Sequence, residues 1–162
     1  RKLMEEPYIP TGTVIMKAAC FDTVGLFDPD IYAEDWEFWL RVALFHRMAY
    51  VGEIWELERD RPGSGSKNLE AVYASNIQAL EKHMGQFADL LADLGVDVNR
   101  RLSTMYRDYG RFLMRSNANL SRQYFRKSLS AGFHLRALAY WGLSCLPSGT
   151  VRFLGRGRAA SL

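Results

Sequence analysis

Apolar and polar residues follow different patterns on the two sides of residue 67. Before it, short apolar runs alternate with turn residues, and these runs predict strands at 13–16, 49–51 and 54–57. The stretch 34–45 is different, because its apolar residues recur three and four positions apart, as in an amphipathic helix. The pattern up to residue 67 therefore predicts an α/β layer structure.

From residue 68 onward the pattern is almost wholly helical, which predicts an all-α helical tail. Glycine and proline residues separate the apolar stretches, so that we expect helices near 69–84, 86–94, 98–116, 120–131 and 134–145. The Gly- and Ser-rich loop at 60–66 places a domain boundary between 1–67 and 68–162. Aromatic residues within 103–132 resemble one degenerate tetratricopeptide-like hairpin, although a plain helical hairpin with an aromatic core fits them as well.

The formal net charge of +3 conceals an uneven distribution along the chain. Residues 1–108 carry a net charge of −6, and the nine Lys and Arg residues after Asp108, the last acidic residue, give +9. A basic tail attracts anionic lipid head groups, nucleic acid or an acidic partner, whereas a solvated helical face accounts for the same charges without a ligand. Both interpretations remain open.

Several functional classes find no support in the sequence. Cys20 and Cys145 are far apart and belong to no Cys/His group, which favours reduced thiols in the cytoplasm. The three histidines lack metal-ligand spacing, and no Gly-rich phosphate loop with its lysine is found. The longest apolar run, 137–146, is about half the roughly 20 residues of a spanning helix. Because the chain opens at Arg1 without a Met, we expect it to be a fragment.

Four motifs stand in a regular order between residues 8 and 67: Thr11-Gly12-Thr13, Gly25-Leu26-Phe27-Asp28, Glu34 to Arg41, and Arg59 to Ser64. Together they resemble the carboxy-terminal part of the inverting family-two glycosyltransferases, which have the GT-A fold. The resemblance implies an α/β fragment of a nucleotide-sugar transferase fold, followed by the helical tail. By the same resemblance Asp35 corresponds to the catalytic base, and Glu34, Trp39, Thr11, Gly12 and Arg61 to the substrate-binding residues.

The chemistry of position 35 agrees with that role. Inverting transfer needs one carboxylate to take the proton from an attacking hydroxyl, and the positive end of a helix dipole favours an ionised Asp. Without the resemblance, capping of the helix by Glu34 and Asp35 is the simpler explanation. Trp36 and Trp39 are three residues apart, so we expect at least one of them in the core. Glu37 and Arg41 are expected to form an ordinary surface pair.

Two departures from the family pattern affect the expected activity. Arg61 stands where the family often has a histidine, and an arginine cannot bind a cation, although it can contact a diphosphate. No Asp-x-Asp metal motif ends an apolar strand, and we interpret Asp28-Pro29-Asp30 as a turn rather than as such a motif. We therefore expect the divalent cation, Mg or Mn, and the nucleotide site to come from upstream residues.

The sequence thus predicts transfer of a sugar from a nucleotide-sugar donor to a hydroxyl of a glycan or lipid-linked acceptor, with the isolated fragment inactive. We expect a cytoplasmic protein with peripheral contact to the inner membrane face through its basic tail, and no specific nucleic-acid partner. The alternative is a non-catalytic helical module that binds a protein or an anionic surface. Its basic residues would be Arg111, Arg115, Arg122, Arg126, Lys127, Arg152, Arg156 and Arg158.

Overall fold

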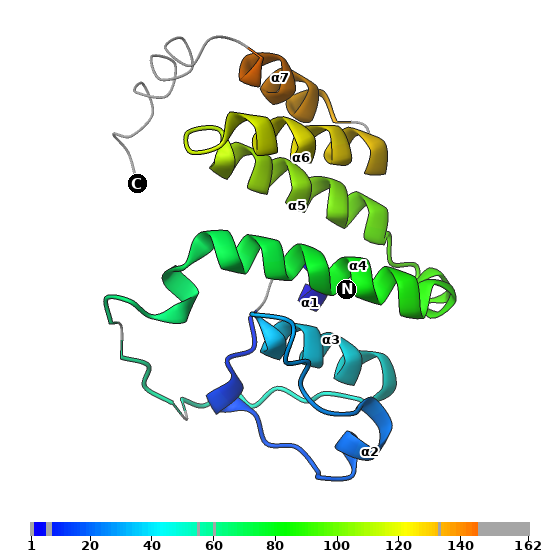
Figure 1. The fold of residues 1–162 in the computed structure, drawn as a ribbon. Coiled ribbons are helices and arrows are strands. Elements are labelled where there is room, and N and C mark those ends of the chain that lie inside the picture. Colours follow the sequence, from blue (N-terminus) through cyan, green and yellow to red (C-terminus); the bar gives the residue numbers. More distant parts are fainter. Residues whose placement is uncertain (1, 6–7, 55, 60, 133, 146–162) are drawn as a thin grey trace. The chain divides into compact units, whose positions relative to one another are not determined.

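A computed structural model describes residues 2–5, 8–54, 56–59, 61–132 and 134–145 of the chain (Figure 1). These residues form helices joined by loops. In chain order the elements are α1 (Lys2–Glu5), the 3-10 helix η1 (Thr11–Thr13), α2 (Cys20–Val24), α3 (Glu34–Phe45), the 3-10 helix η2 (Gly65–Lys67), α4 (Leu69–Asp93), α5 (Val98–Leu113), α6 (Ala118–Ala131) and α7 (Leu135–Ser144). The described part of the chain contains no β-strand.

The predicted α/β fragment of a GT-A fold is therefore wrong. Of the segments expected as strands, 13–16 begins at the end of η1, and 49–51 and 54–57 are loop, with Trp55 outside the described residues. A strand is stable only when a neighbouring strand satisfies its backbone groups, and these runs have no such neighbour within the described ranges. Their apolar side chains face solvent instead, as Ile15 (98% exposed) illustrates.

Helix α3 begins and ends where its periodicity predicts, so the helix expected at 34–45 is confirmed. All its residues from 36 to 42 are buried, so α3 lies at the centre of the segments that pack around it. The Phe38 ring stacks on Phe27 with 4.3 Å between the centroids, and Trp39 meets Phe38 edge-on at 5.1 Å. Because nearly the whole circumference of the helix is covered, its polar residues are buried as well.

Helix α4 joins the two helices expected at 69–84 and 86–94 into one element with a break inside it. Phe87 has non-helical backbone angles, φ −129° and ψ 27°, and interrupts the helix. The chain divides into two compact units at the same place, the first comprising residues 1–88 and the second beginning at Asp89. In the first unit α4 lies alongside α3 (Figure 1).

The second unit is built on a hairpin of α5 and α6, with α7 packed beside α6 (Figure 1). Phe125 on α6 is fully buried and lies against Gly110 on α5. A Cβ atom at position 110 would come 2.9 Å from the Phe125 ring, so only glycine leaves room for this approach. The aromatic contact thus fixes how closely the two helices pack.

Buried serines connect the same two helices through hydrogen bonds. The Ser103 hydroxyl lies 2.7 Å from the carbonyl oxygen of Ser128, and the Ser128 hydroxyl donates back to the Ser103 carbonyl at 2.7 Å. Further along, the Ser121 hydroxyl donates to the Gly110 carbonyl at 2.7 Å. Since buried hydroxyl groups are costly without a partner, these reciprocal bonds favour a single alignment of α5 and α6.

Other predictions about the tail are not tested by this arrangement. The division at residue 67 and the tetratricopeptide-like hairpin at 103–132 stay predictions. Three of the basic residues named for anionic surfaces, Arg152, Arg156 and Arg158, lie outside the described residues. Among the described helices, none has the length and apolar character needed to cross a bilayer.

Candidate functional site

Asp35 lies in the first turn of α3 and is only partly buried. Its Oδ1 accepts a hydrogen bond from the backbone N–H of Trp36 at 2.7 Å, and its Oδ2 accepts one from the Thr11 hydroxyl at 3.3 Å. The first bond satisfies an N–H group in the first turn of α3, whose N-cap residue, Ala33, makes no side-chain capping bond. The second joins residues 24 positions apart, so Asp35 also holds η1 beside α3.

The 3-10 helix η1 brings a second carboxylate to the same place. Glu56 lies against Gly12 so closely that a Cβ atom at position 12 would overlap its carboxylate group. Glu56 is exposed, and the motif order in the sequence did not identify it. Glu56 lies in an apolar run predicted as a strand, and in a strand the face on which its side chain lies depends on the register of strand pairing. The pattern therefore did not indicate that Glu56 lies near Gly12. Thr11 thus contacts Asp35, and the neighbouring Gly12 lies against Glu56.

The start of α3 is held in place by contacts from three other segments. The Ser75 hydroxyl of α4 accepts a hydrogen bond from the Ala33 N–H at 2.7 Å. The buried indole N–H of Trp36 donates to the carbonyl of Leu3 at 2.8 Å. The Tyr32 hydroxyl donates to the Gly65 carbonyl at 3.1 Å. The turn that carries Asp35 is therefore fixed to α1, α4 and η2.

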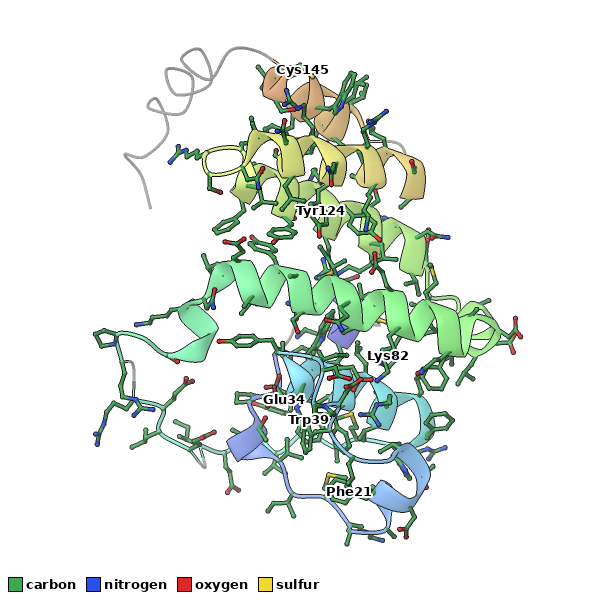
Figure 2. The ribbon with its side chains drawn as sticks, in the orientation of Figure 1. Phe21, Glu34, Trp39, Lys82, Tyr124 and Cys145 are labelled. Atoms are coloured by element: carbon green, nitrogen blue, oxygen red, sulfur yellow. The ribbon has the colours of Figure 1, made fainter. Side chains whose placement is uncertain are left out.

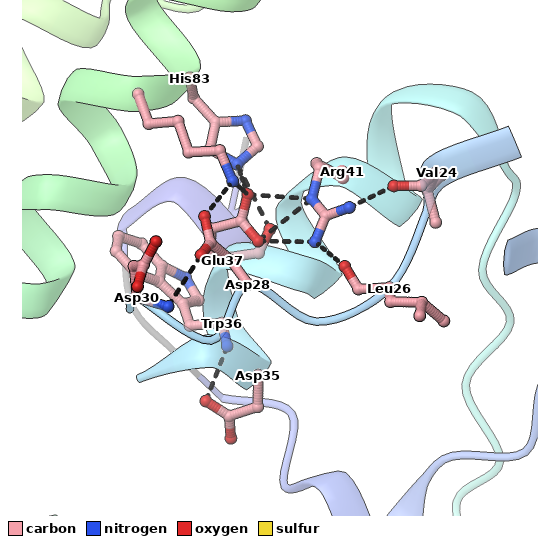
Figure 3. Close-up of polar contacts among 10 residues, drawn as sticks. Val24, Leu26, Asp28, Asp30, Asp35, Trp36, Glu37, Arg41 and His83 are labelled. Carbon is pink, nitrogen blue, oxygen red and sulfur yellow. Dashed lines mark hydrogen bonds and ion pairs between the residues drawn. The ribbon is translucent and has the colours of Figure 1, made fainter. Parts of the chain in front are cut away.

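Two residues further on, Glu37 is the centre of a buried ionic cluster (Figure 3). Its carboxylate accepts hydrogen bonds from Arg41, including Nη2 at 2.8 Å, and from Lys82 Nζ at 2.9 Å. His83 Nε2 lies 3.4 Å from Glu37 Oε1 and 3.3 Å from the Glu37 carbonyl oxygen. Lys82 also donates to Asp28 Oδ2 at 2.7 Å. The pair expected on the surface is thus buried and belongs to a larger cluster.

Arg41 extends this cluster to the turn before α3. Its guanidinium donates to the carbonyl oxygen of Val24, and its Nη2 donates to that of Leu26 at 2.7 Å. These carbonyls flank Gly25, whose φ of +76° favours glycine. The conspicuous glycine and acidic residues of this stretch therefore have structural roles, in a turn and an ion-pair cluster.

The cluster shifts the protonation equilibria of its members. Burial alone would raise the pKa of Glu37, but hydrogen bonds from His83, Arg41 and Lys82 outweigh it and lower that pKa to about 2. A hydrogen bond from Lys82 lowers the pKa of Asp28. Burial opposes the charge of Lys82, yet its bonds to Asp28 and Glu37 raise its pKa overall. All three groups are therefore charged near neutral pH.

Asp28-Pro29-Asp30 forms a turn, as predicted. The Asp30 N–H donates to Asp28 Oδ1 at 2.9 Å, while the other oxygen of Asp28 is bound to Lys82. Both oxygens of Asp28 are thus used within the protein. Neither this turn nor any other group of three His, Cys, Asp or Glu residues in the described ranges is arranged to hold a metal ion.

The remaining predicted site residues lie in different environments. Glu34 is exposed at the start of α3, whereas Trp39 is only 3% exposed and packs in the core (Figure 2). Figure 3 shows Asp35 turned away from the ionic cluster. Arg61 is exposed in the loop before η2. The structure thus brings Thr11, Gly12 and Asp35 together and leaves Trp39 inside, where its indole N–H has no partner among the described residues.

Comparisons with protein-family models, curated proteins and solved structures give no match. Together with the absence of strands from the residues that the structure describes, this result overturns the family assignment and the GT-A fold that it implied. The residues that carried the resemblance have a local explanation, because Gly25, Asp28, Glu37 and Arg41 build the turn and the buried cluster around α3.

Proposed function

We propose that this chain supplies the acceptor-side base of an inverting sugar transfer, with Asp35 in that role. The main support is the position of its carboxylate, which is partly exposed at the start of α3 and aligned by Thr11 and the Trp36 N–H. An ionised carboxylate offers about four acceptor positions. The two protein donors use two of them, which leaves capacity for a substrate hydroxyl.

In the proposed step, Asp35 takes the proton of an acceptor hydroxyl while that oxygen attacks the anomeric carbon of a nucleotide-sugar. The new oxygen–carbon bond forms as the bond between the anomeric carbon and the nucleotide diphosphate breaks. The leaving diphosphate takes the electron pair, and attack from the opposite face inverts the configuration. A base in this role contributes about 10²- to 10⁴-fold to the rate.

The surroundings of Asp35 suit a sugar acceptor. Glu34 is exposed beside it, and Glu56 lies against Gly12, so several carboxylate oxygens are available to accept hydrogen bonds from sugar hydroxyls. The fixed first turn of α3 favours catalysis, because a base must be aligned before the reaction begins. We leave Trp39 out of this site, since its ring is buried.

Arg61 is proposed to contact the leaving diphosphate. It is exposed in the loop before η2, and a guanidinium forms paired hydrogen bonds with phosphate oxygens. The described residues contain no group of His, Cys, Asp or Glu arranged to hold a divalent cation. That a cation and the nucleotide site come from upstream residues, and that the chain alone is inactive, stay predictions.

The proposal is tested with protein from the complete reading frame, incubated with a panel of nucleotide-sugars and hydroxyl acceptors. We expect release of a nucleoside diphosphate together with a glycoside of inverted anomeric configuration, identified by mass spectrometry and NMR. A glycoside of retained configuration would contradict the single-base mechanism. Absence of transfer to every acceptor, in a protein shown to be folded, would contradict the function itself.

The alternative function is a helical module that binds an anionic surface. A specific observation favours it, because Arg107 and Arg136 line one pocket in the second unit. Both functions are compatible within one chain, since the two sets of residues belong to different compact units.

A further inference from the structure

The second unit contains an open pocket of about 480 Å³. Its lining comes from two places in the chain: Arg107 on α5, and the consecutive residues His134, Leu135 and Arg136 where α7 begins. Apart from Leu135, each lining residue carries nitrogen donors. A pocket with this composition favours an anionic ligand.

The pocket has a defined framework. Ser103, one helical turn before Arg107, lies with its hydroxyl 3.0 Å from the Gly132 carbonyl, just after the end of α6. The same hydroxyl lies 2.7 Å from the Ser128 carbonyl. The connection between α6 and α7 is therefore anchored to α5 beside the pocket, and this anchoring places the start of α7 near Arg107.

Arg107 is aligned within this framework. Its side chain is 18% exposed, and it donates to the neighbouring Asp108 through Nε at 3.0 Å and Nη2 at 3.1 Å. This ion pair holds the guanidinium in one orientation and neutralises part of its charge. Arg136 is exposed and adds a second guanidinium from α7. The two arginines come from separate elements and line the same pocket.

The start of α7 supplies further donors. The first N–H groups of a helix have no partner within the helix, and His134, at the N-cap position, makes no side-chain capping bond. The Nε2 atom of His134 is buried and has no hydrogen-bond partner within the described residues. Because this nitrogen is closed off from solvent, the donors that remain for a ligand at the start of α7 are the backbone amides.

We propose that this pocket binds a phosphate monoester group. The two guanidinium groups match phosphate oxygens in charge and geometry, and the first amides of α7, which have no partner within the helix, favour an anion. The ligand is the phosphate of a soluble monoester or of a lipid head group, because both present the same oxygens. This inference is independent of the proposed function, since its residues all lie in the second unit.

The first test is a titration of the isotope-labelled full chain with inorganic phosphate, followed by NMR. We expect saturable shifts of the backbone amides at Arg136 and Ala137. Arg136→Gln and Arg107→Gln should each weaken binding at least about tenfold. The control Arg126→Gln, which removes an exposed positive charge from α6, should leave the affinity unchanged.

Equal weakening by Arg126→Gln and Arg136→Gln would overturn the proposal, because it would show only non-specific attraction to the basic surface. Shifts confined to other residues, or none, would overturn it as well. Arg136 is exposed, so its substitution should not unfold the protein, and circular dichroism checks this. The test therefore does not depend on Arg107→Gln, a substitution that would leave Asp108 unpaired.

A second arm distinguishes the two sources of phosphate. Vesicles containing phosphatidic acid present a monoester, whereas phosphatidylserine vesicles present a diester. If Arg136→Gln reduces binding to phosphatidic acid vesicles about tenfold and hardly affects binding to phosphatidylserine vesicles, the ligand is a lipid head group. If inorganic phosphate binds and neither vesicle does, the ligand is a soluble monoester. Vesicle binding that Arg136→Gln leaves unchanged would contradict a lipid ligand in this pocket.

Discussion

At the scale of single residues, burial decides what each charged side chain does. Glu37 and Arg41 have the spacing of a helix-surface pair, yet both are buried, and Lys82 and Asp28 complete their charge balance. Asp35, two residues before Glu37, is partly exposed and lies outside this cluster (Figure 3). The same helix therefore carries one carboxylate buried in the ion-pair cluster and one that is partly exposed.

Replacing Glu37 by Gln should destabilise the protein strongly. The substitution leaves Arg41 and Lys82 charged without their shared partner, and breaking a buried ion pair from one side costs about 3–5 kcal/mol. Urea unfolding followed by circular dichroism measures the effect. The matched control Glu53→Gln, at an exposed loop position, should change the free energy of unfolding by less than about 0.5 kcal/mol. Similar values for both variants would contradict a stabilising cluster.

The same carboxylate should make stability depend on acidic pH. The pKa of Glu37 is 4.5 in the unfolded reference and about 2 in the folded protein, so its contribution is fully present above pH 4.5. It is lost as the pH falls from 4.5 towards 2, and Asp28, whose pKa is also lowered, acts in the same direction. Unfolding free energies at pH 7, 4.5 and 2.5 test this. A difference between wild type and Glu37→Gln that stays constant over this range would be inconsistent with it.

At the scale of elements, periodicity predicted helices well and strands badly. Helix α3 matches its predicted range because an amphipathic helix satisfies its own backbone and depends on its neighbours only for packing. The runs at 49–51 and 54–57 needed a partner strand, whose presence a short apolar pattern cannot establish. Helix α4 is interrupted at Phe87, two residues after Gly85, so the glycine predicted the position of the break only approximately.

Gly110→Ala should destabilise the α5–α6 hairpin although alanine is the better helix former. The new Cβ would come 2.9 Å from the Phe125 ring, and such overpacking costs about 1–3 kcal/mol, against up to about 1 kcal/mol gained in helix propensity. Thermal unfolding reports the net effect. Gly142→Ala in α7 is the matched control, because a Cβ there meets nothing within 4 Å and should raise stability by up to about 1 kcal/mol. Equal stabilisation by both would mean that the helices are not in close contact at Gly110.

At the scale of the whole molecule, the candidate sites depend on contacts between distant positions, which limits what a sequence can predict. Thr11 and Asp35 were predicted as members of one site, and they form a hydrogen bond across 24 positions. Glu56 was missed because its direction depends on how its loop folds onto Gly12. The contacts of Lys82 with Asp28 and Glu37 span 54 and 45 positions, and the sequence holds no local signal for them.

At this scale, the uneven distribution of charge along the chain can also be related to a place in the structure. The net positive charge after Asp108 suggested contact with anions without indicating where. Arg136 belongs to this basic stretch, and the pocket that it lines together with Arg107 and His134 gives one place for such contact, built from α5 and the start of α7. The two proposals, hydroxyl activation at Asp35 and phosphate binding at Arg107 and Arg136, therefore concern different compact units and do not exclude one another.

The central claim, that Asp35 acts as a base, is tested most directly by the transfer rate of Asp35→Asn in protein from the complete reading frame. The amide preserves the shape of the side chain and removes its capacity to take a proton, so the turnover rate should fall about 10²- to 10⁴-fold. Asp22→Asn, at an exposed position of α2, should retain the wild-type rate. A near-normal rate for Asp35→Asn would contradict the account.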